Sequence, residues 1–228
     1  MVKHIRSELY KLFLHPIYRY SLLAYLVLTM IICIAFRGNY TESFVDSAIP
    51  LVEIFFIVVF LVVGSVWCVE YTDDKIRYLL IANNSRAKLY MAKYVTVCVG
   101  VSTIHLLYSL IVLFFTGFTA SITVVLLLQW VLTLGLASFL VAIAIALRKL
   151  SYLTAFMVVL FLAFRFLLMI DSHAWVVRIL SYFELHYDAI YSVMTPYNEL
   201  PSSIALIAVL WILLGLLSGF LIFAKQDV

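Results

Sequence analysis

The stretch ITVVLLLQWVLTLGLASFLVAIAIAL, residues 122–147, decides the class of this protein. No Asp, Glu, Lys or Arg interrupts it, and about 20 helical residues are enough to cross a hydrocarbon core about 30 Å thick. Its apolar residues are continuous rather than alternating, which favours a helix over a barrel strand. The stretch therefore predicts a transmembrane helix.

The rest of the chain has the same character. Of its 228 residues, 66% are hydrophobic and 12% are charged, whereas soluble domains have about 45–50% apolar and about 25% charged residues. We predict an all-α, polytopic membrane protein with a single transmembrane domain, residues 1–228. Its six predicted transmembrane helices are residues 18–36, 49–69, 95–115, 122–147, 152–170 and 204–223.

The distribution of Lys and Arg predicts the orientation, because these residues are in excess in cytoplasmic connections. If the N-terminus is inside, 12 of the 15 Lys and Arg residues lie on the inner side, which leaves Arg37 and Arg178 outside and Arg165 in the membrane. Both termini are therefore predicted to be cytoplasmic. No basic stretch is interleaved with exposed aromatics, so we expect no nucleic-acid partner.

Residues 1–16 form a predicted amphipathic helix that lies on the inner leaflet, with its cations facing lipid head groups. Pro16 is expected to break this helix before the first span. Two roles stay open, an anchor alone or a support for a cytoplasmic partner. The apolar residues on one arc of this helix are Val2, Ile5, Leu9, Leu12 and Phe13.

The inner connection at residues 70–93 contains a short predicted helix. Thr72 suits its N-cap, and Asp73 suits the positive end of its dipole. Its apolar face, at spacing i, i+3 and i+4, is expected to project toward the cytosol as a hydrophobic knob. Ser85 is predicted to cap the next helix, which continues into the third span. The knob consists of Ile76, Leu79 and Leu80.

This connection resembles that of the type-2 ABC exporter permease family, especially its small six-span members associated with peptide-antibiotic export and immunity. The resemblance rests on Glu70-Tyr71, the paired Leu79-Leu80, Ser85-Arg86 and Ala92-Lys93, and it extends to the length, the basic N-terminal helix and the six spans. Such permeases often carry Gly-Thr where this chain has Asp74-Lys75.

The resemblance implies that residues 70–93 are a coupling segment, which docks on a separate ABC ATPase subunit. The residues it assigns to coupling are Glu70, Asp73, Ile76, Leu79, Leu80, Ser85 and Arg86. A solvated loop whose cations only set the topology is the alternative. The resemblance also implies a bacterial plasma membrane, a second permease copy or a related permease, and short outer helices at residues 171–201. That outer segment is equally compatible with an aromatic belt or a gating role.

Two further features lie within the predicted spans. Glu53 and Arg165 have matching depths below the outer boundary, so we predict an intramembrane pair, the alternative being separate contacts with water and head groups. Gly215 and Gly219 form a small-xxx-small motif that lets another helix approach closely, from the same chain or from a second copy.

The chain lacks the sequence motif that an ATPase needs. None of the seven glycines is followed by Lys, so the phosphate-binding loop of an ATPase is missing. We expect no catalytic residues, no metal and no cofactor in this chain, with ATP and Mg²⁺ on the partner subunit.

The resulting prediction is the permease subunit of an ATP-driven ABC exporter. No span carries the several charges of an ion relay, which favours a hydrophobic or amphipathic cargo, such as an antimicrobial peptide or a lipid-like molecule, over an ion. The alternative is an ATP-independent immunity or sensor protein that binds a peptide or a partner.

Overall fold

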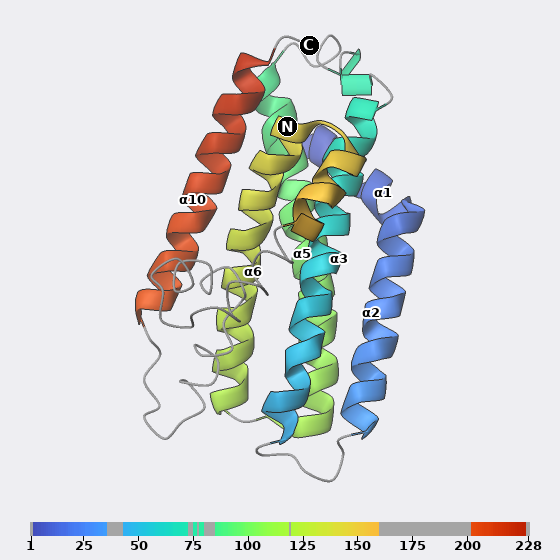
Figure 1. The fold of residues 1–228 in the computed structure, drawn as a ribbon, viewed down its shortest axis with the longest axis vertical. Coiled ribbons are helices and arrows are strands. Elements are labelled where there is room, and N and C mark those ends of the chain that lie inside the picture. Colours follow the sequence, from blue (N-terminus) through green and yellow to red (C-terminus); the bar gives the residue numbers. More distant parts are fainter. Residues whose placement is uncertain are drawn as a thin grey trace.

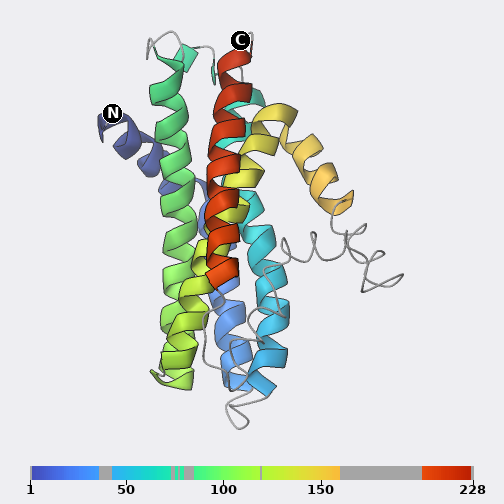
Figure 2. The same cartoon turned by 90° about the vertical axis from the view of Figure 1, so that its left-hand side faces the viewer.

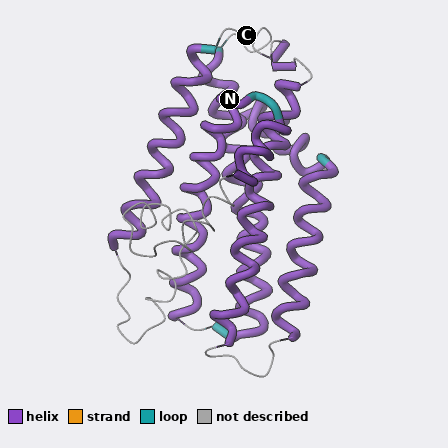
Figure 3. The backbone as a smooth tube through the Cα atoms, viewed as in Figure 1, coloured by secondary structure: helices purple, strands orange, loops and turns teal. Residues whose placement is uncertain are grey.

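The structure is a computed structural model that describes residues 2–35, 43–72, 75–76, 78–79, 85–118, 120–159 and 202–226. Every regular element in these residues is an α-helix, which confirms the predicted all-α membrane fold (Figure 3). The helices are α1 (Val2–Leu14), α2 (Pro16–Ala35), α3 (Ser43–Thr72), α5 (Arg86–Thr116), α6 (Ala120–Leu147) and α10 (Ser202–Lys225), together with the helical segment Leu150–Val159.

Four helical stretches among the described residues are long and apolar enough to cross a membrane. They are Pro16–Ala35, Arg86–Phe115, Ile122–Leu147 and Ala208–Lys225. The two other predicted spans appear as the shorter apolar stretches Ile57–Tyr71 and Leu150–Val159. The described residues thus support four of the six predicted spans in full.

The long helices run side by side in a bundle, and the two chain ends lie at the same end of it (Figure 1). We call this the charged end, defined by Glu8, Glu70 and Lys93. There α1 branches away from the bundle, and the segment Leu150–Val159 leans outward from the end of α6 (Figure 2). Helix α10 packs mainly on α6.

Local sequence explains where several helices begin and end. Pro16 occupies the first turn of α2, a position where its missing N–H costs nothing. Ser85 caps α5 as predicted, and its hydroxyl accepts a hydrogen bond from the Lys88 N–H at 3.4 Å. Gly117 ends α5 with a φ of 84°, a left-handed conformation that glycine adopts without strain.

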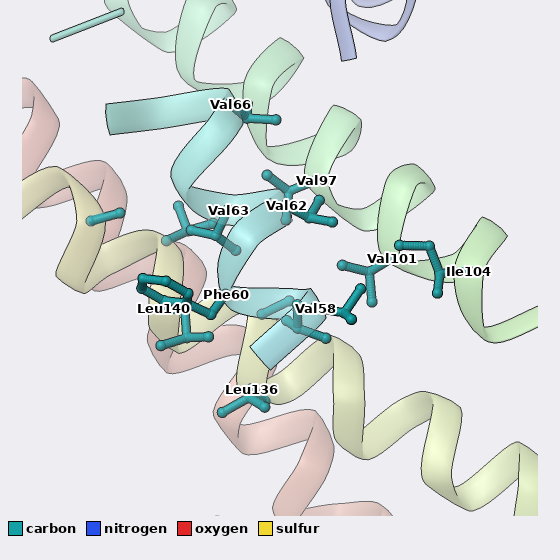
Figure 4. Close-up of a cluster of buried hydrophobic side chains, with 14 of the residues drawn as sticks. Val58, Phe60, Val62, Val63, Val66, Val97, Val101, Ile104, Leu136 and Leu140 are labelled. Atoms are coloured by element: carbon teal, nitrogen blue, oxygen red, sulfur yellow. The ribbon is translucent and has the colours of Figure 1, made fainter. Parts of the chain in front are cut away.

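One cluster of the core consists of Phe60 and of valine, isoleucine and leucine side chains from α3, α5 and α6 (Figure 4). A column of valines on α3 fills the space between α5 and α6. Close packing of this kind, rather than burial from water, holds helices together in a lipid environment. The residues labelled in this cluster are Val58, Phe60, Val62, Val63, Val66, Val97, Val101, Ile104, Leu136 and Leu140.

Candidate functional site

The coupling segment connects α3 to α5 at the charged end, and its described residues face in two directions. Ile76 is 2% exposed and belongs to the hydrophobic core, and Leu79 packs against that core. Tyr78 is 72% exposed and Lys75 is exposed as well. The segment is therefore anchored by its aliphatic side chains and presents an aromatic and a cationic side chain outward.

Four charged side chains from three helices form what we call the charged network: Glu8 and Lys11 of α1, Glu70 of α3 and Lys93 of α5. Glu70 and Lys93 are the first and last residues of the coupling segment. The Lys93 side chain is completely buried. Its ammonium lies 3.1 Å from a carboxylate oxygen of Glu8, contacts Glu70, and donates to the Val66 carbonyl at 2.9 Å. Each cation thereby helps to hold α1 on the bundle.

Lys11 completes the charged network from its outer side. Its ammonium lies 2.6 Å from Glu8 and 3.2 Å from Glu70, so each lysine contacts both carboxylates. Two positive and two negative charges cancel at the junction of α1, α3 and α5. This compensation is required because a buried charge without a partner costs several kcal/mol.

The pKa values in α1 reflect this compensation. Burial raises the pKa of the Glu8 carboxyl, but the charge of Lys93 and the hydrogen bond from Lys11 outweigh it, so the pKa lies below its ordinary value of 4.5. Burial lowers the pKa of Lys11, but the hydrogen bond to Glu8 and the charge of Glu70 bring it above its ordinary value of 10.5. Both groups are ionised around neutral pH.

Apolar contacts attach α1 at a second point. Leu12 is 3% exposed, and its Cδ2 atom occupies the space beside Gly100, where an added Cβ would lie only 2.6 Å away. From the adjoining helix α2, the Tyr18 hydroxyl donates to the Gly100 carbonyl at 3.2 Å, so α1 and α2 both contact this glycine. Helix α1 is therefore packed on α5, and it presents Val2 and Tyr10 to its surroundings, at 80% and 69% exposure.

On the opposite side, the end of α10 is held by a set of residues that we call the C-terminal clasp: Tyr71, Arg86, Ile145, Ala224 and Gln226. The buried Gln226 carboxamide accepts from the Tyr71 hydroxyl at 2.6 Å and donates to the Ile145 carbonyl at 2.7 Å. The Arg86 guanidinium donates to the carbonyls of Ala224, at 2.8 Å, and Gln226, at 2.6 Å. The clasp joins the ends of α3, α6 and α10 to the start of α5.

Aromatic side chains fill the space between the charged network and the C-terminal clasp. The Trp67 ring centroid lies 5.6 Å from both the Lys93 ammonium and the Phe223 ring centroid. The Tyr90 ring lies 5.7 Å from Trp67, and its hydroxyl donates to the Leu216 carbonyl at 2.8 Å. Such contacts join α3, α5 and α10 in a packed layer.

This arrangement is suited to holding helices in register. In the described part of the chain, no group of three or more His, Cys, Asp or Glu side chains could hold a metal ion. The ionised groups of the charged network neutralise one another. Between α3 and α5, the described residues include two exposed side chains, Lys75 and Tyr78. These two helices are held to α1 by the charged network and to α10 by the C-terminal clasp.

A comparison with protein families matches residues 4–166 to the ABC-2 family transporter proteins. The chain belongs to this family. The matched region includes all four residues of the charged network and the whole coupling segment, whereas α10 and Gln226 lie beyond it. A comparison with curated proteins gives no match.

Membership in the ABC-2 family identifies the chain as a multi-pass membrane protein and as a permease component of an ABC transporter. Members of the family are in general transport components rather than catalysts, and the family implies an ABC ATPase as partner.

The structure changes the picture of the predicted knob in this ABC-2 chain. Ile76 is buried by its own chain, so the expectation that it projects toward the cytosol is wrong, and Leu79 is partly buried as well. The physical reason is that an apolar helical face looks the same whether its own subunit or a partner covers it. Asp73 and Leu80 lie outside the described residues.

The other predicted coupling residues have internal contacts. Glu70 belongs to the charged network, Ser85 is an N-cap, and Arg86 belongs to the C-terminal clasp. Their assignment to ATPase coupling stays a prediction. Of the predicted intramembrane pair, Arg165 lies outside the described residues and the side chain of Glu53 is not described, so their pairing also stays a prediction.

Gly215 and Gly219 lie where α10 approaches its neighbours most closely. A Cβ added to Gly215 would lie 2.6 Å from the Ser138 carbonyl oxygen and 2.7 Å from the Phe139 nitrogen. At Gly219 it would lie 2.7 Å from the Tyr90 hydroxyl. The helices that approach the motif are thus α6 and α5 of the same chain.

Sequence reasoning missed the pairing of Lys93 with Glu8 and the role of Gln226. One signal was present for Lys93, because it is a lone cation between Ala92 and Tyr94 in an otherwise apolar stretch. The sequence analysis uses Lys93 as one of the inner cations and as part of the Ala92-Lys93 pair in the family resemblance, but it predicts no ion pair for it. For Gln226 the sequence contains no comparable signal, since its partners come from three distant helices.

Proposed function

We propose that this ABC-2 family chain is the permease subunit of an ATP-driven exporter, and that an ABC ATPase docks on its coupling segment. The observation that carries this proposal is the two-sided geometry of that segment. Ile76 anchors it in the bundle, whereas Tyr78 and Lys75 face outward. A surface of this kind can transmit a push to the bundle because its inner side is packed rather than free.

In this mechanism the permease supplies the path and the ATPase supplies the energy. Two copies of the chain, or one copy with a related permease, pair with two ATPase subunits that carry ATP and Mg²⁺. Closure of the ATPases moves the coupling segment, and the bundle switches between inward-facing and outward-facing states. The charged network and the C-terminal clasp make α3 and α5 respond together.

We further propose a hydrophobic or amphipathic cargo, such as an antimicrobial peptide. Within the spans predicted from the sequence, the described buried polar side chains, for example Gln129 and Thr133, include no Asp, Glu, Lys or Arg, whereas an ion relay uses charged groups. In proteoliposomes that contain the complete transporter, an amphipathic antimicrobial peptide should stimulate ATP hydrolysis. Unchanged hydrolysis with a panel of such peptides would argue for another cargo class.

Isolation of the full chain from native membranes in mild detergent tests the partner. An ABC ATPase should be isolated with the wild-type chain, and Tyr78→Ala should reduce the amount of ATPase retained because Tyr78 lies on the proposed docking surface. The variant should still fold, since the exposed Tyr78 side chain contributes little to this subunit's own packing. The matched control is Tyr10→Ala, which removes another exposed tyrosine, on α1. Leu79→Asp is a poorer test because Leu79 packs on the core.

The outcomes separate the alternatives. Loss of ATPase with Tyr78→Ala alone supports the docking surface. If Tyr78→Ala retains as much ATPase as Tyr10→Ala does, the docking surface is contradicted. Absence of any ATPase from the wild-type preparation contradicts the exporter and supports an ATP-independent immunity or sensor protein.

A further inference from the structure

The C-terminal clasp has a geometry that goes beyond closing a helix end. We propose that Arg86 and Gln226 are positioning residues that fix the end of α10 to the coupling segment, so that a displacement of the segment is transmitted to α10 and from there to α6. This inference rests on the proposed function for its purpose, but the physical link can be tested without a partner.

The first argument concerns Arg86. The last carbonyls of a helix have no partner within the helix, and they form the negative end of its dipole. Arg86 Nη1 donates to one of them, that of Ala224, at 2.8 Å, and to the carbonyl of Gln226, directly after the helix, at 2.6 Å. Arg86 is also the first residue of α5 and lies within the coupling segment. Its cation is therefore committed to α10 instead of being presented to a partner.

The second argument concerns Gln226, which is only 6% exposed. Its carboxamide uses both ends, the oxygen for the Tyr71 hydroxyl of α3 and the nitrogen for the Ile145 carbonyl of α6. The carbonyl of Ile145 can only accept, so the nitrogen has to face it. A carboxylate cannot replace this group, because it would place an oxygen against the carbonyl.

The third argument is that aromatic contacts make this link stiff. Phe223 packs between Trp67 and Tyr90, with ring centroids 5.6 and 6.1 Å away. These rings come from the two helices that enter and leave the coupling segment. The end of α10 thus contacts both of them, while farther along its length α10 rests mainly on α6. A shift of the segment has a short, packed route to α10.

The experiment measures the distance between the coupling segment and the end of α10. Spin labels are placed on the full chain in nanodiscs at Tyr78→Cys and Lys225→Cys, which are both exposed positions. Cys33, Cys68 and Cys98 are replaced by alanine so that labelling is specific. With an intact clasp, the distance distribution should be narrow.

The test variants are Arg86→Ala, Gln226→Ala and their combination, and the matched control is Lys88→Ala, an exposed cation in the same first turn of α5. We expect the test variants to broaden the distribution, most in the combination, and Lys88→Ala to leave it narrow. The single Arg86→Ala variant guards against loss of the fold, because it removes only hydrogen bonds at the helix end. A narrow distribution in a folded combined variant overturns the link.

A second measurement separates this inference from the proposed function. Where an ATPase is isolated with the wild-type chain, ATP should change the distance between the label on Lys225→Cys and a second label on α2. The combined variant should lose this change in distance while it retains the ATPase. A shift that persists in the combined variant contradicts transmission through the clasp. Absence of the ATPase contradicts the proposed function, but the distance distribution still decides the link.

Discussion

The charged network and the C-terminal clasp hold the same two helices, α3 and α5, by different physical means. The network uses four charges, of which Lys93 is fully buried. The clasp uses one arginine at a helix end and a neutral carboxamide. Removal of one charge leaves an uncompensated ion in the interior, whereas removal of the carboxamide leaves only unmade hydrogen bonds. A single substitution in the network should therefore cost more free energy of unfolding than a single substitution in the clasp.

Loss of the central cation should have the largest effect. Lys93→Met keeps much of the side-chain volume but leaves Glu8 and Glu70 close together without their buried partner. We expect a loss of about 3–5 kcal/mol in the free energy of unfolding, as for other broken buried ion pairs. Thermal unfolding in detergent measures it, and Lys88→Met, which removes an exposed lysine of the same helix, is the control.

A compensated variant distinguishes charge from shape. Combining Lys93→Met with Glu8→Gln and Glu70→Gln removes the unpaired carboxylates, so much of the lost stability should return. If the triple variant is no more stable than Lys93→Met alone, the damage lies in packing, and the electrostatic description of the network is incorrect.

The clasp should show an intermediate effect. Gln226→Ala leaves the Tyr71 hydroxyl and the Ile145 carbonyl without their partner, which should cost about 1–3 kcal/mol. Lys225→Ala, at the exposed neighbouring position, should change stability by less than about 0.5 kcal/mol. Thermal unfolding again provides the comparison. Equal effects of the two substitutions would mean that the carboxamide is not holding the helix end.

Acid and alkali should act on the network and spare the clasp. The lowered pKa of Glu8 contributes stability above pH 4.5, and this contribution is lost as the pH falls through the lowered value. The raised pKa of Lys11 contributes below pH 10.5 and is lost as the pH rises through the raised value. Hydrogen exchange of residues 2–14, corrected for intrinsic rates, should accelerate at both extremes and stay constant between them. Protection that stays constant at both the acid and the alkaline extreme would contradict this prediction.

The outer cation of the network should matter least. About half of the Lys11 side chain is exposed, and its ion pairs are screened by solvent. Lys11→Ala should therefore cost no more than about 1 kcal/mol, and the cost should decrease with added salt. A loss as large as that of Lys93→Met would show that the two lysines contribute equally to the free energy of unfolding.

Local features of this chain could be predicted, and long-range partners could not. The sequence predicts Ser85 as a cap because its partner, the Lys88 N–H, lies only three positions along the chain. Lys93 looked like one more inner cation, since its burial depends on where α1 and α3 place Glu8 and Glu70. Ile76 shows the same limit, because periodicity identifies an apolar face but not the surface that covers it.

The contact between Leu12 and Gly100 gives access to α1 by steric means alone. A methyl group at position 100 would require the end of the flexible Leu12 side chain to move, so Gly100→Ala should weaken the packing of α1 on α5 without removing any charged group. That property suits a conditional allele, in which a modest rise in growth temperature releases α1 in living cells. Genetic screens could then identify the cellular process that is impaired first when α1 is released.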